Sequence, residues 1–135
     1  MIESMTLAPM TITLALVSGP NLPPGEHPDH LIEARVVLDA SGRLDPAAWA
    51  ADPDPWPARR IAPDKAPQDG VVHFDPDEGW TLSFWQSSAD QPEARPTLFD
   101  PGPQPLRPGE YVTVTEPDET QSGYRIVGVQ PFIPA

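Results

Sequence analysis

Apolar and polar residues alternate most clearly between residues 70 and 86 of this 135-residue chain. On either side of the turn-forming segment 75–79, every second residue is large and apolar, because the side chains of a strand point alternately to its two faces. The two arms pair best in one register, which places three residues of the first opposite three of the second: Gly70 with Phe84, Val72 with Leu82, and Phe74 with Trp80. The pattern therefore predicts a β-hairpin with one apolar face.

Similar alternation predicts further strands elsewhere in the chain: residues 6–17, 31–39, 110–115 and 124–130, with a short edge strand at 97–99. Both faces of the last hairpin carry apolar residues, so we expect it to be buried on both sides or curled into a barrel, with Gly128 providing the bend. We predict a single all-β domain spanning residues 1–135. Its architecture would be a small antiparallel β-barrel or sandwich of about six strands.

One short helix and two long loops complete the prediction. Asp45 is a suitable N-cap and Pro46 suits the first helical position, so we expect a helix near 45–51 that lays Trp49 on the sheet. The chain contains 21 prolines, which cannot donate to a strand ladder. Residues 52–69 and 87–108 are rich in proline and show no periodicity, so we expect long irregular loops there.

Charge and composition limit the classes of partner. Twenty acidic against eight basic residues give a formal net charge of -12, which disfavours binding to nucleic acid or to an anionic membrane. Two interpretations of this charge stay open: it keeps the protein apart from its neighbours, or it forms an acidic surface that docks on a basic partner protein. There is no cysteine, and the first twenty residues contain no secretory signal or membrane span, so we expect a cytoplasmic protein.

Candidate metal ligands occur in the segment 26–30, Glu-His-Pro-Asp-His. His27 and His30 are three residues apart and lie beside two carboxylates, and His73 is a further ligand that the fold could bring near them. The alternative is a polar surface loop, because a proline-containing loop is no rigid support and the spacing matches no known ligand pattern. The sequence leaves both interpretations open.

Candidate binding residues are aromatic and basic. If the second face of the central hairpin is open, Trp85 and His73, together with Trp56, would form an aromatic platform for a sugar or an extended peptide. The alternative is that the tryptophans are structural. Three of the eight basic residues are close in sequence: Arg59, Arg60 and Lys65. They either balance local charge or form a small patch that accepts an anion.

No motif for nucleophilic catalysis, phosphate binding or dinucleotide binding occurs, so we predict no catalytic residue and no cofactor, and an enzyme is not favoured. Three hypotheses follow. The first is a non-enzymatic module that binds another protein through an edge strand or its acidic loops. The second is a small-ligand or carbohydrate-binding β domain using Trp85 and its neighbours. The third is a metal-dependent enzyme using His27, His30 and His73.

Overall fold

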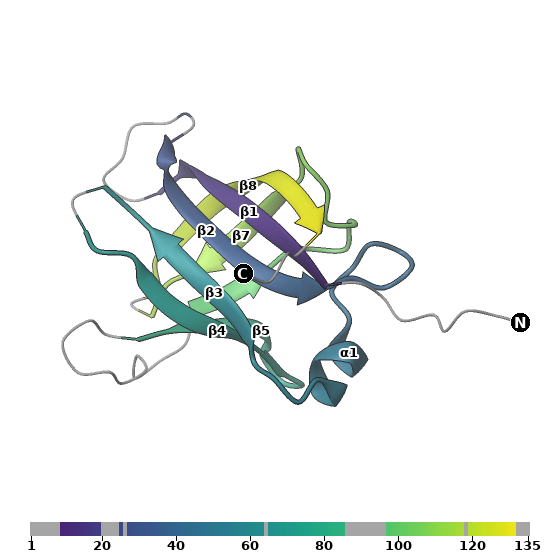
Figure 1. Cartoon of the computed structure of the whole chain (residues 1–135). Helices are drawn as coiled ribbons and strands as arrows, with labels where there is room; N and C mark the ends of the chain where they lie inside the picture. Colours follow the sequence, from purple (N-terminus) through teal and green to yellow (C-terminus); the bar gives the residue numbers. More distant parts are fainter. Residues whose placement is uncertain are drawn as a thin grey trace, which may run out of the picture.

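The described residues form a closed antiparallel barrel of eight strands with one short helix (Figure 1). The computed structural model describes residues 9–19, 25, 27–63, 65–85, 97–117 and 119–131. Strands adjacent in sequence pair with each other, and the first pairs with the last. The elements in chain order are β1 (Pro9–Ser18), β2 (His27–Val37), α1 (Pro46–Ala51), β3 (Trp56–Ile61), β4 (Gln68–Asp75), β5 (Gly79–Phe84), β6 (Thr97–Asp100), β7 (Tyr111–Thr115) and β8 (Gln121–Pro131).

This architecture confirms the all-β prediction and selects the barrel over the sandwich, with eight strands in place of about six. The segment 52–69 is not an irregular loop throughout, because it contains β3 and the start of β4. The strand expected at 97–99 exists as β6, but it is no edge strand, since it pairs with β5 and with β7. Residues 6–8 of the expected first strand and residues 87–96 of the second expected loop lie outside the described residues.

The central hairpin has the predicted register. Phe74 pairs with Trp80, Val72 with Leu82, and Gly70 with Phe84. Gly70 is required here because β4 and β5 approach closely at this point. A Cβ atom at this position would overlap the Ser83 carbonyl and lie 2.9 Å from the Phe84 Cα. Glycine in a strand interior marks such a close approach of two backbones.

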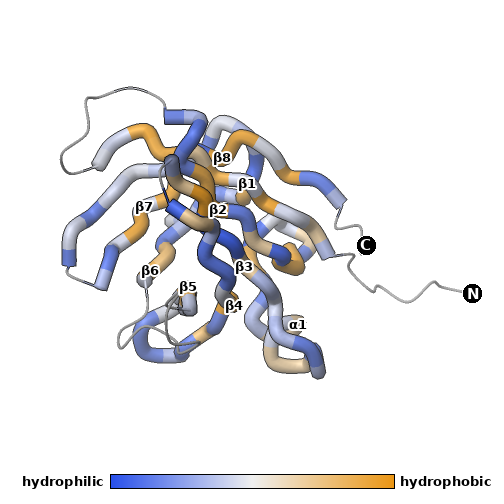
Figure 2. The backbone as a smooth tube through the Cα atoms, turned by 60° about the vertical axis from the view of Figure 1, so that its left-hand side comes forward, coloured by the Kyte–Doolittle hydropathy of each residue, from blue (hydrophilic) through white to orange (hydrophobic). Residues whose placement is uncertain are grey.

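Side chains fill the barrel interior. Figure 2 shows hydrophobic and hydrophilic residues alternating along the strands, because each strand points one face inward. Trp56 is fully buried inside and stacks on Trp80, with ring centroids 5.8 Å apart and planes 11° from parallel. Phe74 packs against the same indole at 4.9 Å. The other fully buried large side chains come from all around the barrel: Ile12, Leu14, Ile32, Val36, Leu82, Phe84, Val112, Val114 and Ile126.

The pairing of β1 with β8 closes the barrel. Its register shifts between Thr13, which pairs with Gly128, and Leu14, which pairs with Ile126, so Val127 is the extra residue of a β-bulge beside the glycine expected to bend the strand. The apolar residues of the last hairpin do not all point inward, since Val127 is 45% exposed. The hairpin is therefore curled into the barrel wall, one of the two predicted arrangements.

The helix predicted near 45–51 is present as α1 and lies at one end of the barrel (Figure 1). The Asp45 side chain accepts hydrogen bonds from two backbone N–H groups of its first turn. Trp49 lies against β4, where its Nε1 donates to the Val72 carbonyl at 3.1 Å. Its ring contacts His73 edge to face at 4.8 Å. In the described part of the chain, no helix has the length and apolar character needed to cross a membrane.

Asp52, directly after α1, ties the helix to the barrel. Its carboxylate accepts from the indole Nε1 of Trp56 at 2.9 Å and from Nη1 of Arg35 at 3.2 Å. It also accepts from the backbone N–H of Asp54 at 3.0 Å. The Asp54 N–H is the largest cause that lowers the pKa of Asp52, followed by the Trp56 indole, with Arg35 adding to the effect. All three groups favour the ionised carboxylate.

We expect this carboxylate to link stability to acid pH. Its pKa is lower in the folded protein than the ordinary value of about 3.9, so its contribution is complete above that pH and is lost as pH falls through the folded pKa. Asp52→Asn should lower the melting temperature at pH 7 and reduce the further fall in melting temperature between about pH 5 and pH 2. Thermal unfolding by circular dichroism measures both. Asp54→Asn, which keeps the backbone donor, is the control. Parallel pH profiles for wild type and Asp52→Asn would contradict the assignment.

Candidate functional site

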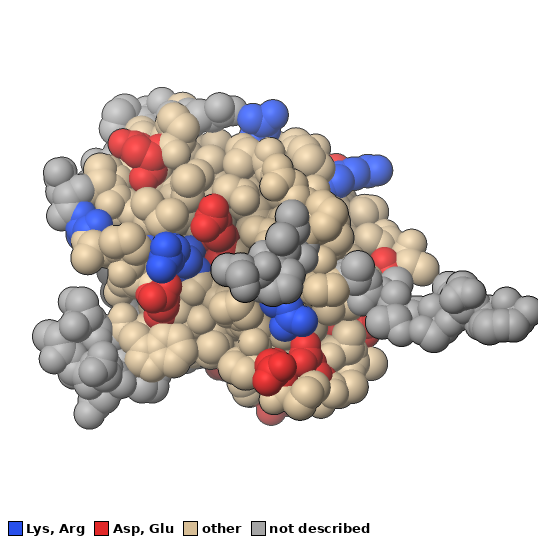
Figure 3. Space-filling view, in the orientation of Figure 1, with Lys and Arg blue, Asp and Glu red and all other residues tan. Residues whose placement is uncertain are grey.

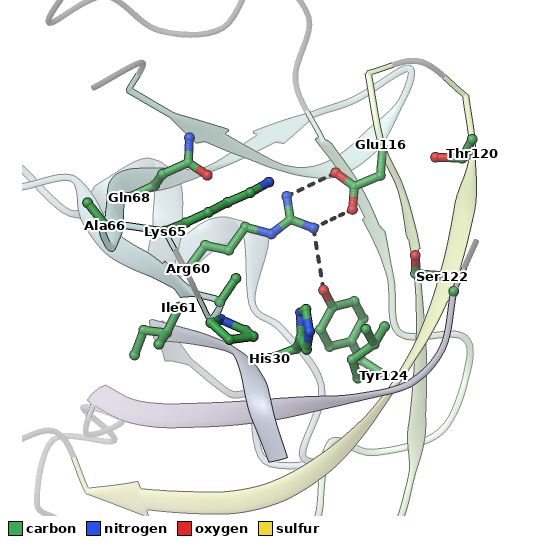
Figure 4. A pocket seen from close by; sticks show the side chains of 14 residues that line it. His30, Arg60, Ile61, Lys65, Ala66, Gln68, Glu116, Thr120, Ser122 and Tyr124 are labelled. Atoms are coloured by element: carbon green, nitrogen blue, oxygen red, sulfur yellow. Dashed lines mark hydrogen bonds and ion pairs between the residues drawn. The ribbon is translucent and has the colours of Figure 1, made fainter. Parts of the chain in front are cut away.

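A pocket of about 330 Å³ opens at the end of the barrel opposite α1 (Figure 4). We call this end the mouth: β1, β3, β5 and β7 end there, and β2, β4 and β8 begin there. Both polar and apolar residues line the pocket. Its polar lining comprises His30, Arg60, Lys65, Gln68, Glu116, Thr120, Ser122 and Tyr124. Its apolar lining includes Leu16, Ile61, Ala62, Pro63 and Ala66.

An ion pair between Arg60 and Glu116 lies inside this pocket. Arg60 points inward because it continues the alternation of the buried residues Trp56 and Ala58 along β3. Glu116 follows β7 at the next inward position after Val114. The guanidinium binds the carboxylate with two parallel hydrogen bonds, Nη1 to Oε1 at 2.9 Å and Nη2 to Oε2. The two side chains are only 21% and 19% exposed, so the charges are largely removed from water.

Tyr124 and Phe84 complete the surroundings of Arg60. The Tyr124 hydroxyl accepts a third, longer hydrogen bond from Nη2 at 3.4 Å (Figure 4). Below the pair, the Arg60 Cζ lies 5.6 Å from the centroid of the Phe84 ring, a cation–π contact. The ion pair therefore separates the apolar core of the barrel from the open part of the pocket.

The pKa shifts fix the charge states of this group. Burial by itself lowers the pKa of Arg60, but the hydrogen bonds and charges of Glu116 and Tyr124 outweigh it, so the net shift is upward and the guanidinium stays charged. Burial raises the pKa of Tyr124, and the neighbouring Arg60 only partly opposes this rise. The phenol is therefore neutral near pH 7, so its hydroxyl can donate a hydrogen bond as well as accept the one from Arg60.

Lys65 adds a second cation to the pocket. In Figure 4 its side chain extends toward the Arg60–Glu116 pair from the segment between β3 and β4. Lys65 forms no ion pair with a residue of the described ranges. Among the described Lys, Arg, Asp and Glu residues, those that line the pocket are therefore two cations and one carboxylate, a surplus of one positive charge.

The three neighbouring basic residues of the sequence separate in the fold. Arg60 and Lys65 line the pocket, whereas Arg59 points outward and bonds Asp69 of β4 at 3.0 Å on the exposed surface. Alternation along β3 alone produces this division.

The candidate metal ligands are only partly brought together. His27 and His30 lie near each other at the start of β2, with ring centroids 5.9 Å apart, and His30 lines the pocket. His73 lies near the opposite end of the barrel, on the outer surface against Trp49. The described residues contain no group of three or more His, Cys, Asp or Glu side chains able to hold a metal ion.

The three expected platform residues occupy different environments. Trp56 is fully buried within the barrel, and His73 is in contact with Trp49. Trp85 is 37% exposed, just past the mouth end of β5, where its backbone N–H donates to the Asp69 carbonyl. The indole of Trp56 therefore does not share a surface with that of Trp85.

The sequence alone pointed to Arg60, Lys65 and His30 but not to Glu116, Thr120, Tyr124, Ser122 and Gln68. One signal was available in the pattern. Glu116 is polar at a position that continues the buried alternation of β7, and Arg60 does the same on β3. A charged residue at an inward position near a strand end marks a group that lines the mouth of a barrel.

No protein-family model, curated protein or solved structure matches the chain. The fold itself defines the class, a closed up-and-down β-barrel of eight strands. Barrels of this size either fill their interior with side chains or hold one small ligand. This barrel is filled along most of its length and open at its mouth.

A double-mutant cycle measures the coupling of Arg60 and Glu116. Removing one partner of a buried pair typically costs about 3–5 kcal/mol. Because both side chains here retain some exposure, we expect Arg60→Met or Glu116→Leu to lower the free energy of unfolding by about 2–3 kcal/mol. The double variant should lose much less than the sum of the single losses, because no unpaired charge remains.

Urea unfolding at equilibrium measures these changes. Arg59→Met is the matched control: its ion pair with Asp69 is solvent-exposed, so its loss should cost less than about 1 kcal/mol. Additive losses in the double variant would show that the two charges are not coupled.

Proposed function

We propose that this barrel binds a small organic ligand in its mouth pocket. The mouths of β-barrels are preferred sites for small molecules, and such pockets combine apolar walls with a few well-placed polar groups. The pocket of about 330 Å³ has this composition, because both apolar residues and residues with hydroxyl, amide and charged groups line it. This is the second hypothesis from the sequence, moved from the Trp85 surface to the mouth.

The observation that carries the proposal is the Arg60–Glu116 pair inside the pocket. A buried ion pair is often no more stabilising than well-packed apolar residues of the same volume, so stability alone does not account for it. Charged groups that are held in fixed positions above the apolar core of the barrel are suited to orient a ligand. The pKa values of Arg60 and Tyr124 are both shifted upward, further from pH 7, which favours a role in binding over one in proton transfer for these two groups.

Filling the mouth should abolish binding. Ala66 is exposed and lines the pocket, so Ala66→Trp should occupy the space without disturbing the barrel core. We expect molecules in a library of small polar metabolites, screened by saturation-transfer NMR, to bind the wild type and to lose at least about tenfold in affinity for this variant.

Ala47→Trp provides the matched control, because Ala47 is an exposed alanine of α1 at the opposite end of the barrel. It should bind the same molecules as the wild type. A library without binders, or binders unaffected by Ala66→Trp, would refute a ligand site at the mouth.

A second candidate function is docking to a basic partner protein. The loops at the α1 end, residues 38–55, 75–79 and 100–110, carry nine acidic residues and two basic ones. Figure 3 shows acidic side chains grouped at the lower edge of the molecule, where α1 lies in Figure 1. Docking by strand addition is not supported, because each of the eight described strands pairs with two neighbours.

An oligolysine peptide is a suitable probe for this second function. We expect its binding at low salt to shift the backbone NMR resonances of these loops, and the shifts to disappear near 0.5 M NaCl because exposed charges are screened. Shifts spread evenly over the barrel, or unchanged by salt, would argue against a docking surface at the α1 end.

A further inference from the structure

We infer that the ligand of the mouth pocket is a small organic monoanion, a carboxylic acid with an apolar body. This inference rests on the proposed function and assigns the ligand class of the same site. Its basis is the distribution of charge and of unused hydrogen-bond donors around Arg60 and Lys65.

The charge that lines the pocket differs in sign from the charge of the whole chain. The whole chain carries a formal charge of -12, yet the charged residues lining the mouth sum to one positive charge, because Arg60 and Lys65 face the single carboxylate of Glu116. A carboxylate inside the pocket would therefore meet more positive than negative charge among the described residues that line it.

Arg60 and Lys65 also supply hydrogen-bond donors to the pocket. A guanidinium has five N–H donors, and Glu116 and Tyr124 use three of those of Arg60. Two N–H groups of Arg60 therefore donate neither to Glu116 nor to Tyr124. The ammonium of Lys65, whose side chain extends toward the Arg60 guanidinium in Figure 4, brings three more donors to the pocket. A carboxylate placed between Arg60 and Lys65 would accept charge-assisted hydrogen bonds from both.

The surplus charge selects a monoanion. A phosphate monoester carries about -1.5 to -2 near pH 7 and would leave uncompensated negative charge next to Glu116. An amine would meet Arg60 and Lys65 with the same sign of charge. A carboxylate carries one negative charge, which matches the surplus of one positive charge.

The apolar residues that line the pocket favour a ligand whose remaining part is apolar. Leu16, Ile61 and Pro63 face the same space as the charged groups. An aliphatic or aromatic body bound there would remove its own apolar surface and that of the wall from water. A carboxylic acid with such a body therefore matches both the charged and the apolar residues that line the pocket.

Three probes of one chain length, which differ only in the head group, test the inference. Titration calorimetry or NMR should show that hexanoate binds at least about tenfold more tightly than hexanamide, and that hexylamine does not bind. Lys65→Gln should weaken hexanoate about tenfold and leave hexanamide unchanged. Arg107→Gln, which removes an exposed cation at the α1 end, is the matched control and should leave all three affinities unchanged.

Three outcomes would contradict a monoanionic ligand without contradicting the proposed function. The first is that hexanamide or hexylamine binds as tightly as hexanoate, and the second is that inorganic phosphate displaces bound hexanoate when its concentration is lower than that of hexanoate. The third is that Lys65→Gln does not change the affinity for hexanoate. The same holds if none of the probes binds while metabolites of the library bind and are excluded by Ala66→Trp. Hexanoate binding that persists in Ala66→Trp would place the anion outside the mouth. Absence of every binder, probes and library alike, would refute both proposals.

Discussion

The pairing of β1 with β8 is the constraint on which the rest of the structure depends. It turns a row of eight strands into a closed wall, gives every strand two partners, and separates an interior from an exterior face. Only this closure brings Arg60 on β3 opposite Glu116 after β7, 56 residues away in sequence. The bulge at Val127 and the neighbouring Gly128 allow the last strand to bend enough to meet the first. The mouth pocket is thus a property of the whole barrel and belongs to no single hairpin.

Local rules were enough to predict the parts of the fold whose partners are close in sequence. The central hairpin has the expected register because apolar residues on both arms and a turn with Pro76 and Gly79 permit one pairing. β3 was missed for a physical reason. Pro57 and the arginine pair obscure its alternation, and proline, which has no backbone N–H, is accepted there because it lies at the start of β3, where the ladder with β2 extends only as far as Ala58. β6 has only four residues, too few for a pattern to separate an edge strand from a paired one.

The candidate site could be predicted only in part. Arg60 was selected together with Arg59 because basic residues are rare in this acidic chain and these two are adjacent. Their side chains point to opposite faces because both lie in β3, a strand that the sequence pattern did not predict. Glu116 could not be assigned, because in an acidic chain one carboxylate resembles the other nineteen until its partner is known. His30 was considered for a metal, and the fold places it in the wall of the pocket instead. Pairwise contacts across a barrel are long-range, and single-sequence reasoning has no access to them.

Closure by the first and last strands also sets the order of events as the chain folds. Hairpins such as β4–β5 can form from neighbouring residues, but the β1–β8 ladder joins segments more than a hundred residues apart, as in the pairing of Met10 with Pro131. Contacts of such high sequence separation slow folding, and until β8 arrives two strand edges stay open to other chains. The period of greatest risk of aggregation is therefore the time on the ribosome before β8 emerges, when neither the pocket nor a protected edge yet exists.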